Sequence, residues 1–125
     1  MILDTNAISS LISGDPRLEV VLAVSLRHHL PVIALGEYRF GLRASKYRHV
    51  IEPLLDRLEQ ESQVLAVTAA TAQFYADVRH ELMVAGHPIP ENDVWIAAIA
   101  RQHDLPIVSR DEHLRRVKGV TVISW

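Results

Sequence analysis

The sequence contains no cysteine, no long apolar run and no strong excess of charge of either sign. The absence of cysteine excludes disulfides and thiolate metal sites, and it fits the reducing cytoplasm. No apolar stretch approaches the ~20 residues that a helix needs to cross a bilayer, and the first residues lack the pattern of a secretory signal. We therefore expect a cytoplasmic protein that makes no membrane contact.

The overall charge does not by itself indicate a nucleic-acid-binding protein. The formal net charge is −2, from 15 acidic residues against 13 Lys and Arg, whereas proteins that hold nucleic acid through charge alone are strongly basic. If four of the acids belong to a metal site, the rest of the surface is mildly basic, and bound cations add positive charge. An acidic net charge is therefore compatible with binding to nucleic acid.

Length and composition predict one domain that spans residues 1–125. The chain is 49% hydrophobic and 22% charged, a balance typical of globular proteins with one real core. Short apolar runs alternate with segments of helical periodicity. We predict strands at about 1–3, 31–35, 64–67, 106–109 and 120–124, and helices at about 6–13, 16–29, 37–46, 50–61 and 92–103, with another helix around 75–85 and a helical turn at 112–117. This alternation predicts an α/β fold whose mostly parallel sheet of about five strands is covered by helices on both faces.

Four carboxylates are predicted to meet at one edge of this sheet. Asp4 directly follows the first strand, and Asp111 comes two residues after the strand PIVS. Glu37 comes two residues after the predicted second strand, and Asp93 opens the helix that leads to the fourth strand. Ligands of parallel α/β sheets bind outside the carboxyl ends of the strands, and crossover helices begin at that same edge. All four acids are therefore expected to face one rim.

Clustered carboxylates repel one another unless cations neutralise them, and oxygen-rich clusters suit Mg²⁺ or Mn²⁺. Such ions lower the pKa of a bound water and neutralise charge on a phosphodiester. Each acid taken alone also has a structural explanation, because Asp and Glu are common helix caps and first-turn residues. The prediction of a metal site depends on all four acids sharing one edge.

Four motifs in order resemble the PIN-domain family, and within it the VapC-type endoribonuclease toxins of toxin–antitoxin systems. They are ILDTNAIS, IALGEYRFGL, IPENDVWIAAIA and PIVSRDEHL, and they cover essentially the whole chain. The resemblance implies a PIN-like three-layer α/β/α sandwich and metal-dependent cleavage of RNA, in tRNA or ribosomal RNA. By position, Asp4, Glu37, Asp93 and Asp111 would be the catalytic, metal-binding acids. Asn6 and Ser109 match polar positions that support the site, although the family often has Thr where Ser109 stands.

The resemblance also implies partners: a small antitoxin that covers the site, a homodimer and a toxin–antitoxin hetero-oligomer. Apolar residues of the first two helices are candidates for such an interface or for the core, and the sequence alone leaves both open. They are Ile8, Leu11, Ile12, Leu18, Val21 and Leu22.

Basic residues near the acids are candidates for contact with RNA. Arg39, Arg43 and Lys46 follow Glu37 at helical spacing, and Arg110 precedes Asp111. A solvated helix face explains the first three equally well. His113 follows Asp111 by two residues, so it is either a substrate contact or a residue with a surface or structural role.

Two rival functions remain open at this point. One is a PIN nuclease that matures RNA outside toxin systems. The other is a receiver-like binding module, which usually carries paired acids after its first strand and a phosphoacceptor Asp after a middle strand. Here Asp4 has no acidic neighbour and the predicted third strand is followed by Thr68, so the residues disfavour a receiver.

Overall fold

Three pairs of α-helices separate the first four of five strands along the chain, and the computed structural model describes all of residues 1–125. The strands are β1 (Ile2–Leu3), β2 (His29–Pro31), β3 (Gln63–Leu65), β4 (Ile107–Val108) and β5 (Val122–Ile123). The helices are α1 (Thr5–Ile12), α2 (Pro16–Leu22), α3 (Val32–Leu42), α4 (Arg48–Glu61), α5 (Ala69–Ala85) and α6 (Glu91–His103), and a short 3₁₀ helix, η1, covers Leu114–Arg116. None of these helices combines the length and the apolar character that spanning a membrane requires.

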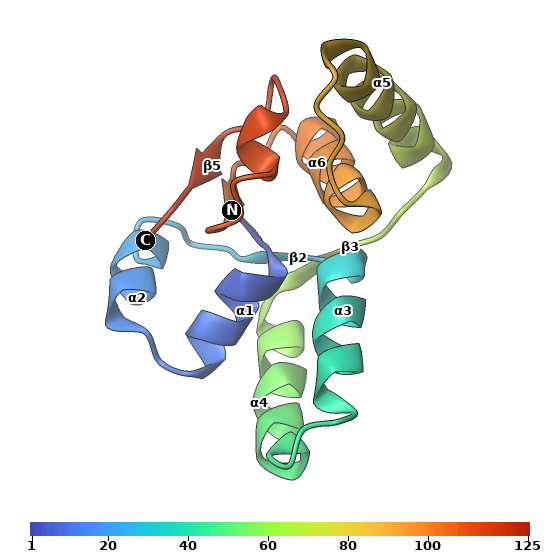
Figure 1. The fold of residues 1–125 in the computed structure, drawn as a ribbon. Helices are drawn as coiled ribbons and strands as arrows, with labels where there is room; N and C mark the ends of the chain where they lie inside the picture. The colour runs from blue at the N-terminus through green and yellow to red at the C-terminus, as the bar shows by residue number, and fades with distance from the viewer.

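The strands form one sheet in the order β3-β2-β1-β4-β5, and every neighbouring pair is parallel. The central strand β1 places Ile2 opposite His29 on one side and Ile107 on the other. Helices α1 to α4 gather on one side of the strands and α5 and α6 on the other (Figure 1). The predicted three-layer α/β/α sandwich is therefore confirmed, and the sheet is parallel throughout.

The core lies between these layers and receives side chains from all six helices, with the strands and α6 as its most continuously buried parts. Ile2, Leu3, Ile107 and Val108 of the central strands are completely buried. Such near-continuous apolar strands are expected in a parallel sheet that is covered on both faces. In α6 the run from Ile96 to Ala100 is buried, so the N-terminus of this helix is held firmly at the carboxyl edge of the sheet.

The prediction is wrong around the second strand. The segment 31–35 (PVIAL) was expected to be a strand, but β2 is His29–Pro31 and Val32 already begins α3. A short, wholly apolar run fits a buried strand or a buried helix equally well, so periodicity could not decide. As a result Glu37 lies in the second turn of α3, and the helix predicted at 37–46 ends at Leu42.

The second helix is also shorter than predicted. It begins as expected, with Asp15 as cap and Pro16 as first residue, but it ends at Leu22 rather than near His29. The backbone N–H of His29 donates to the carbonyl of Met1, and β2 pairs with β1 from this point. The chain must therefore leave the helix early enough to become extended where it enters the sheet.

Candidate active site

A pocket of about 600 Å³ opens at the carboxyl edge of the sheet, and all four predicted acids line it. Asp4 directly follows β1, and Asp111 follows β4 by three residues. Glu37 comes from α3, and Asp93 lies in the first turn of α6. Four segments far apart in the sequence therefore bring their carboxylates to one place, which we call the acidic pocket.

Asp4 is the most enclosed of the four acids, with 4% of its surface exposed. Its Oδ1 accepts a hydrogen bond of 2.7 Å from the backbone N–H of Thr5, so Asp4 also caps α1. Its Oδ2 accepts a hydrogen bond of 2.7 Å from the hydroxyl of Ser109. The capping role and a role in the pocket are thus compatible, because the two oxygens have different partners.

Ser109 and Asn6 connect Asp4 to the loop after β4. The fully buried hydroxyl of Ser109 accepts a hydrogen bond of 2.9 Å from the backbone N–H of Asp111. The Asn6 side-chain amide donates to Ser109 Oγ at 3.2 Å, and its Oδ1 accepts from the backbone N–H of Arg110 at 3.1 Å. These bonds fix Asp4 and Asp111 relative to each other.

Glu37 reaches the pocket from the second turn of α3, and its Oε2 accepts a hydrogen bond of 3.0 Å from the hydroxyl of Thr5. Thr5 is thus a contact between α1 and α3 at the pocket wall. On α3, Tyr38 also lines the pocket, and burial raises the pKa of its phenol.

Asp93 and Asp111 form the far side of the pocket and also line an adjoining cavity of about 420 Å³ with His113. The side chain of Asp93 is 12% exposed and that of Asp111 is 30% exposed. Asp93 lies in the first turn of α6, where the helix dipole favours a negative charge.

The electrostatics of the pocket oppose the presence of so many negative charges. Burial raises the pKa of Asp4, and the charges of Glu37 and Asp111 raise it further, although hydrogen bonds from Ser109 and Thr5 act in the opposite direction. Burial, followed by the charges of Asp111 and Asp4, raises the pKa of Asp93 to about 6. A cation that binds these carboxylates therefore relieves both the desolvation and the repulsion.

A family model for the PIN domain matches residues 1–120. The chain belongs to the PIN-domain family. It is 27% identical to ribonuclease VapC5 of Mycobacterium tuberculosis over 124 residues, which cover 98% of this chain and 90% of that protein. It is 32% identical to toxin FitB of Neisseria gonorrhoeae over 124 residues, which cover 89% of this chain and 87% of that protein. A solved structure of VapBC-5 from M. tuberculosis, a member of the VapBC family of toxin–antitoxin systems, matches with a TM-score of 0.73 at 26% identity and covers 98% of this chain and 94% of its own.

Membership of the PIN-domain family, with VapC ribonucleases among its relatives, disfavours the receiver-like module. The donor set of the pocket also fits the metal dependence that is typical of PIN-domain ribonucleases. Its oxygens come mainly from carboxylates, which are the ligands that hard divalent cations prefer. In addition, single ligand atoms of Asp93, Asp111 and His113 lie within 4.8 Å of one another. The acidic cluster of this PIN domain can therefore bind a metal ion.

The basic residues predicted to contact RNA do not line the acidic pocket. Arg39 is paired with Asp56 and Glu59 of α4, and Arg43 lies 3.8 Å from Glu52 of the same helix. In the structure these ion pairs join Arg39 and Arg43 to α4. Contact of either side chain with RNA stays a prediction.

The side chains of Lys46 and Arg110 also contact neighbouring side chains. The Lys46 ammonium lies 5.1 Å from the ring centre of Tyr47. The Arg110 guanidinium packs 4.2 Å from the Trp125 ring centre and pairs with Asp15 at 3.3 Å. The backbone of Arg110, rather than its side chain, contacts Asn6 of the site, and contact of either side chain with RNA stays a prediction.

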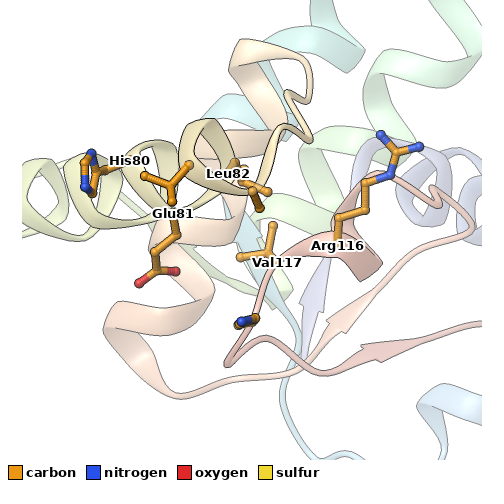
Figure 2. Close-up of a pocket in the computed structure, with 8 residues that line it drawn as sticks. His80, Glu81, Leu82, Arg116 and Val117 are labelled. Atoms are coloured by element: carbon orange, nitrogen blue, oxygen red, sulfur yellow. The ribbon is translucent and has the colours of Figure 1, made fainter.

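Figure 2 shows a different cavity, of about 320 Å³, between the end of α5 and the segment after η1. Leu82 and Val117 line it together with Arg116 and Lys118. Its one acidic residue, Glu81, is paired with Arg101 at 2.8 Å. This cavity lacks the cluster of acids that distinguishes the pocket at the sheet edge.

Sequence reasoning missed two features of the site. Thr5 was not identified as a partner of Glu37, because the contact joins residues 32 positions apart and depends on the rotation of both helices. For His113 the sequence left open a substrate contact or a surface or structural role, and it did not predict that the ring lies against Asp93 and Asp111. The only sequence signal for His113 was its position two residues after Asp111.

Proposed function

We propose that this protein is a divalent-metal-dependent endoribonuclease and the toxin of a toxin–antitoxin pair. The observation that carries the proposal is the convergence of four carboxylates from four segments on one pocket of a PIN domain. The relatives named ribonuclease VapC5 and toxin FitB, which align with nearly the whole chain, support the same function.

Asp4, Glu37, Asp93 and Asp111 would hold Mg²⁺ or Mn²⁺. When bound, such an ion lowers the pKa of a water and neutralises charge on the phosphate group. The protein supplies the fixed positions of the oxygens: Ser109 orients Asp4 and the backbone of Asp111, while Thr5 orients Glu37. Hydrolysis by water leaves a 5′-phosphate and a 3′-hydroxyl, and it needs no attack by the RNA 2′-hydroxyl.

The substrate class we propose is tRNA or ribosomal RNA, cut in a loop. Sequence-specific recognition of RNA targets single-stranded loops, because bases in a helix are hard to reach. The pocket is open on one side, and the adjoining cavity beside Asp93 and Asp111 extends it. A protein that acts on such RNA would work in the cytoplasm, where these RNAs are found.

The partner we propose is a small antitoxin, bound to a toxin homodimer as a hetero-oligomer. Half of the six apolar residues named on the first two helices are buried in the core, namely Ile8, Leu18 and Leu22, and the other three are partly buried against it. Exposed apolar side chains occur on several helices, including Val20 of α2, which is 72% exposed. On the adjacent helices α3 and α4, Phe40 is 79% and Val50 is 55% exposed. We propose that the antitoxin covers this α3–α4 surface. The solved structure from a VapBC toxin–antitoxin system, which resembles this fold over nearly its whole length, supports such a partner.

The test is cleavage of total cellular RNA by the purified, antitoxin-free protein, with Mg²⁺, with Mn²⁺ and with EDTA. We expect discrete cuts with either ion and none with EDTA. Asp4→Asn should abolish cleavage, while the matched control Asp77→Asn, at an exposed position of α5, should not. Cleavage that survives both EDTA and Asp4→Asn would contradict the proposal.

A growth assay distinguishes a toxin from an RNA-maturation nuclease. Expression of the active protein should arrest growth, and co-expression of the small protein encoded beside it should restore growth. If RNA is cut in vitro but growth is unaffected, the maturation nuclease becomes the better explanation.

A further inference from the structure

The ring of His113 faces two of the four acids of the pocket. The backbone N–H of His113 donates a hydrogen bond of 2.8 Å to Asp111 Oδ1, which forms a tight local turn. As a result, His113 Nδ1 lies 3.0 Å from Asp111 Oδ1 and 3.6 Å from Asp93 Oδ2. The histidine therefore adds a nitrogen to an otherwise oxygen-rich site.

This nitrogen has no hydrogen-bond partner although it is shielded from solvent. Asp111 Oδ1, at 3.0 Å, is near enough to accept a hydrogen bond, but the ring is not turned so that an N–H would point at it. Asp93 Oδ2, at 3.6 Å, is too far away to accept one. A buried polar atom without a partner costs free energy, so native proteins rarely contain one. A simple ion pair between His113 and the acids does not explain this orientation.

The geometry does fit three ligand atoms around one cation. Octahedral ions with ligands at ~2.1 Å place adjacent ligand atoms about 3.0 Å apart. The separations of His113 Nδ1 from the two oxygens, 3.0 and 3.6 Å, lie at or slightly above this value. All three candidate atoms are within 4.8 Å of one another, so they form a candidate site for one metal ion.

We infer that His113 Nδ1 is a direct ligand of the cation in the acidic pocket, and that this imidazole makes the site select transition metals such as Mn²⁺ over Mg²⁺. Imidazole nitrogen binds first-row transition metals well, whereas Mg²⁺ takes almost only oxygen ligands. The inference rests on the metal site of the proposed function, and it adds a ligand from outside the four acids. It concerns binding, so it can be tested without any RNA.

The experiment is pulsed electron paramagnetic resonance of Mn²⁺ bound to the full chain. We expect a nitrogen coupling in the wild type that disappears in His113→Gln and persists in His49→Gln, a matched control at an exposed position of α4. The same substitution at His113 should weaken Mn²⁺ binding by roughly tenfold or more, by analogy with other losses around metal sites. Mg²⁺ binding, measured by competition with Mn²⁺, should change far less.

Labelling the wild-type protein with ¹⁵N-histidine gives a second readout that needs no variant, because the coupling should change to that of ¹⁵N. If the wild type binds Mn²⁺ without any nitrogen coupling, or if the coupling survives in His113→Gln, the histidine is not a ligand. Either result leaves the four-acid nuclease intact. A wild type that binds no Mn²⁺ at all would overturn both this inference and the metal dependence of the proposed function.

Discussion

Replacing Asp93 with asparagine should stabilise the metal-free protein although it removes a residue that we propose is essential for cleavage. Burial and neighbouring carboxylates raise the pKa of Asp93 from its ordinary 3.8 to about 6. At ~1.4 kcal/mol per pH unit this difference corresponds to about 3 kcal/mol of destabilisation once the carboxylate is ionised. Solvent in the open pocket screens the charges, so we expect the free energy of unfolding of Asp93→Asn to exceed that of the wild type by about 1–2 kcal/mol at pH 7.5.

The pH dependence gives the sign of this effect. A carboxyl group with a higher pKa in the folded state binds its proton more tightly there than in the unfolded chain. The free energy of unfolding of the wild type should therefore fall as the pH rises from about 4 through about 6. In Asp93→Asn this part of the pH dependence should be absent, so the two proteins should converge near pH 4.

Urea unfolding in EDTA, at several pH values between 4 and 8, measures both effects. Asp77→Asn, which removes an exposed carboxylate of α5, is the control and should track the wild type. Addition of Mn²⁺ should then stabilise the wild type more than Asp93→Asn. If Asp93→Asn is less stable than the wild type in EDTA at pH 7.5, the reasoning about charge repulsion in the pocket is wrong.

Three further substitutions separate the support of the site from general stability. Ser109→Ala leaves the backbone N–H of Asp111 without its acceptor, so the free energy of unfolding in urea should fall by about 1–3 kcal/mol. Calorimetry should also show a loss of Mn²⁺ affinity. Unchanged affinity would argue against a supporting role. Thr5→Val keeps the shape of the side chain but removes the hydrogen bond to Glu37. We expect Mn²⁺ affinity to fall by about tenfold. An affinity equal to that of the wild type would show that Glu37 needs no such partner. Thr71→Val removes a buried hydroxyl that accepts a hydrogen bond from the backbone N–H of the helix cap Thr68 and donates one to Gln102. The free energy of unfolding should therefore fall by about 1–2 kcal/mol, while Mn²⁺ affinity stays that of the wild type. Reduced affinity would link the site to α5.

The parallel fold could be predicted because its signals are local. Asp15 followed by Pro16 is a strong helix start, and it was placed correctly. Four of the five strands were found as short apolar runs, although they proved only two or three residues long. The strand predicted for PVIAL was wrong because an apolar run with β-branched residues fits a buried helix as well as a buried strand. The pairing of His29 with β1, which places the strand earlier in the chain, cannot be read from this run.

The convergence of the four acids could be predicted from topology even where an element was wrong. Glu37 was assigned to the start of a helix and lies instead in its second turn, yet it still lines the pocket because α3 begins at the carboxyl edge of the sheet. Among the partners of these acids, Ser109 and Asn6 were named only through the family resemblance, and the others could not be predicted. The contact of Thr5 with Glu37 and the ring orientation of His113 depend on side-chain geometry, which no spacing in the sequence encodes.

The chemistry of the RNA ends is the most direct test of a nuclease that uses water and the four acids of this pocket. The measurement is sequencing of the ends produced by the wild-type protein with Mn²⁺, with an EDTA sample and Asp4→Asn as references. We predict 5′-phosphate and 3′-hydroxyl ends at discrete sites, absent from both references. Ends that carry 2′,3′-cyclic phosphate and form equally well in EDTA would show attack by the RNA 2′-hydroxyl and would contradict the account.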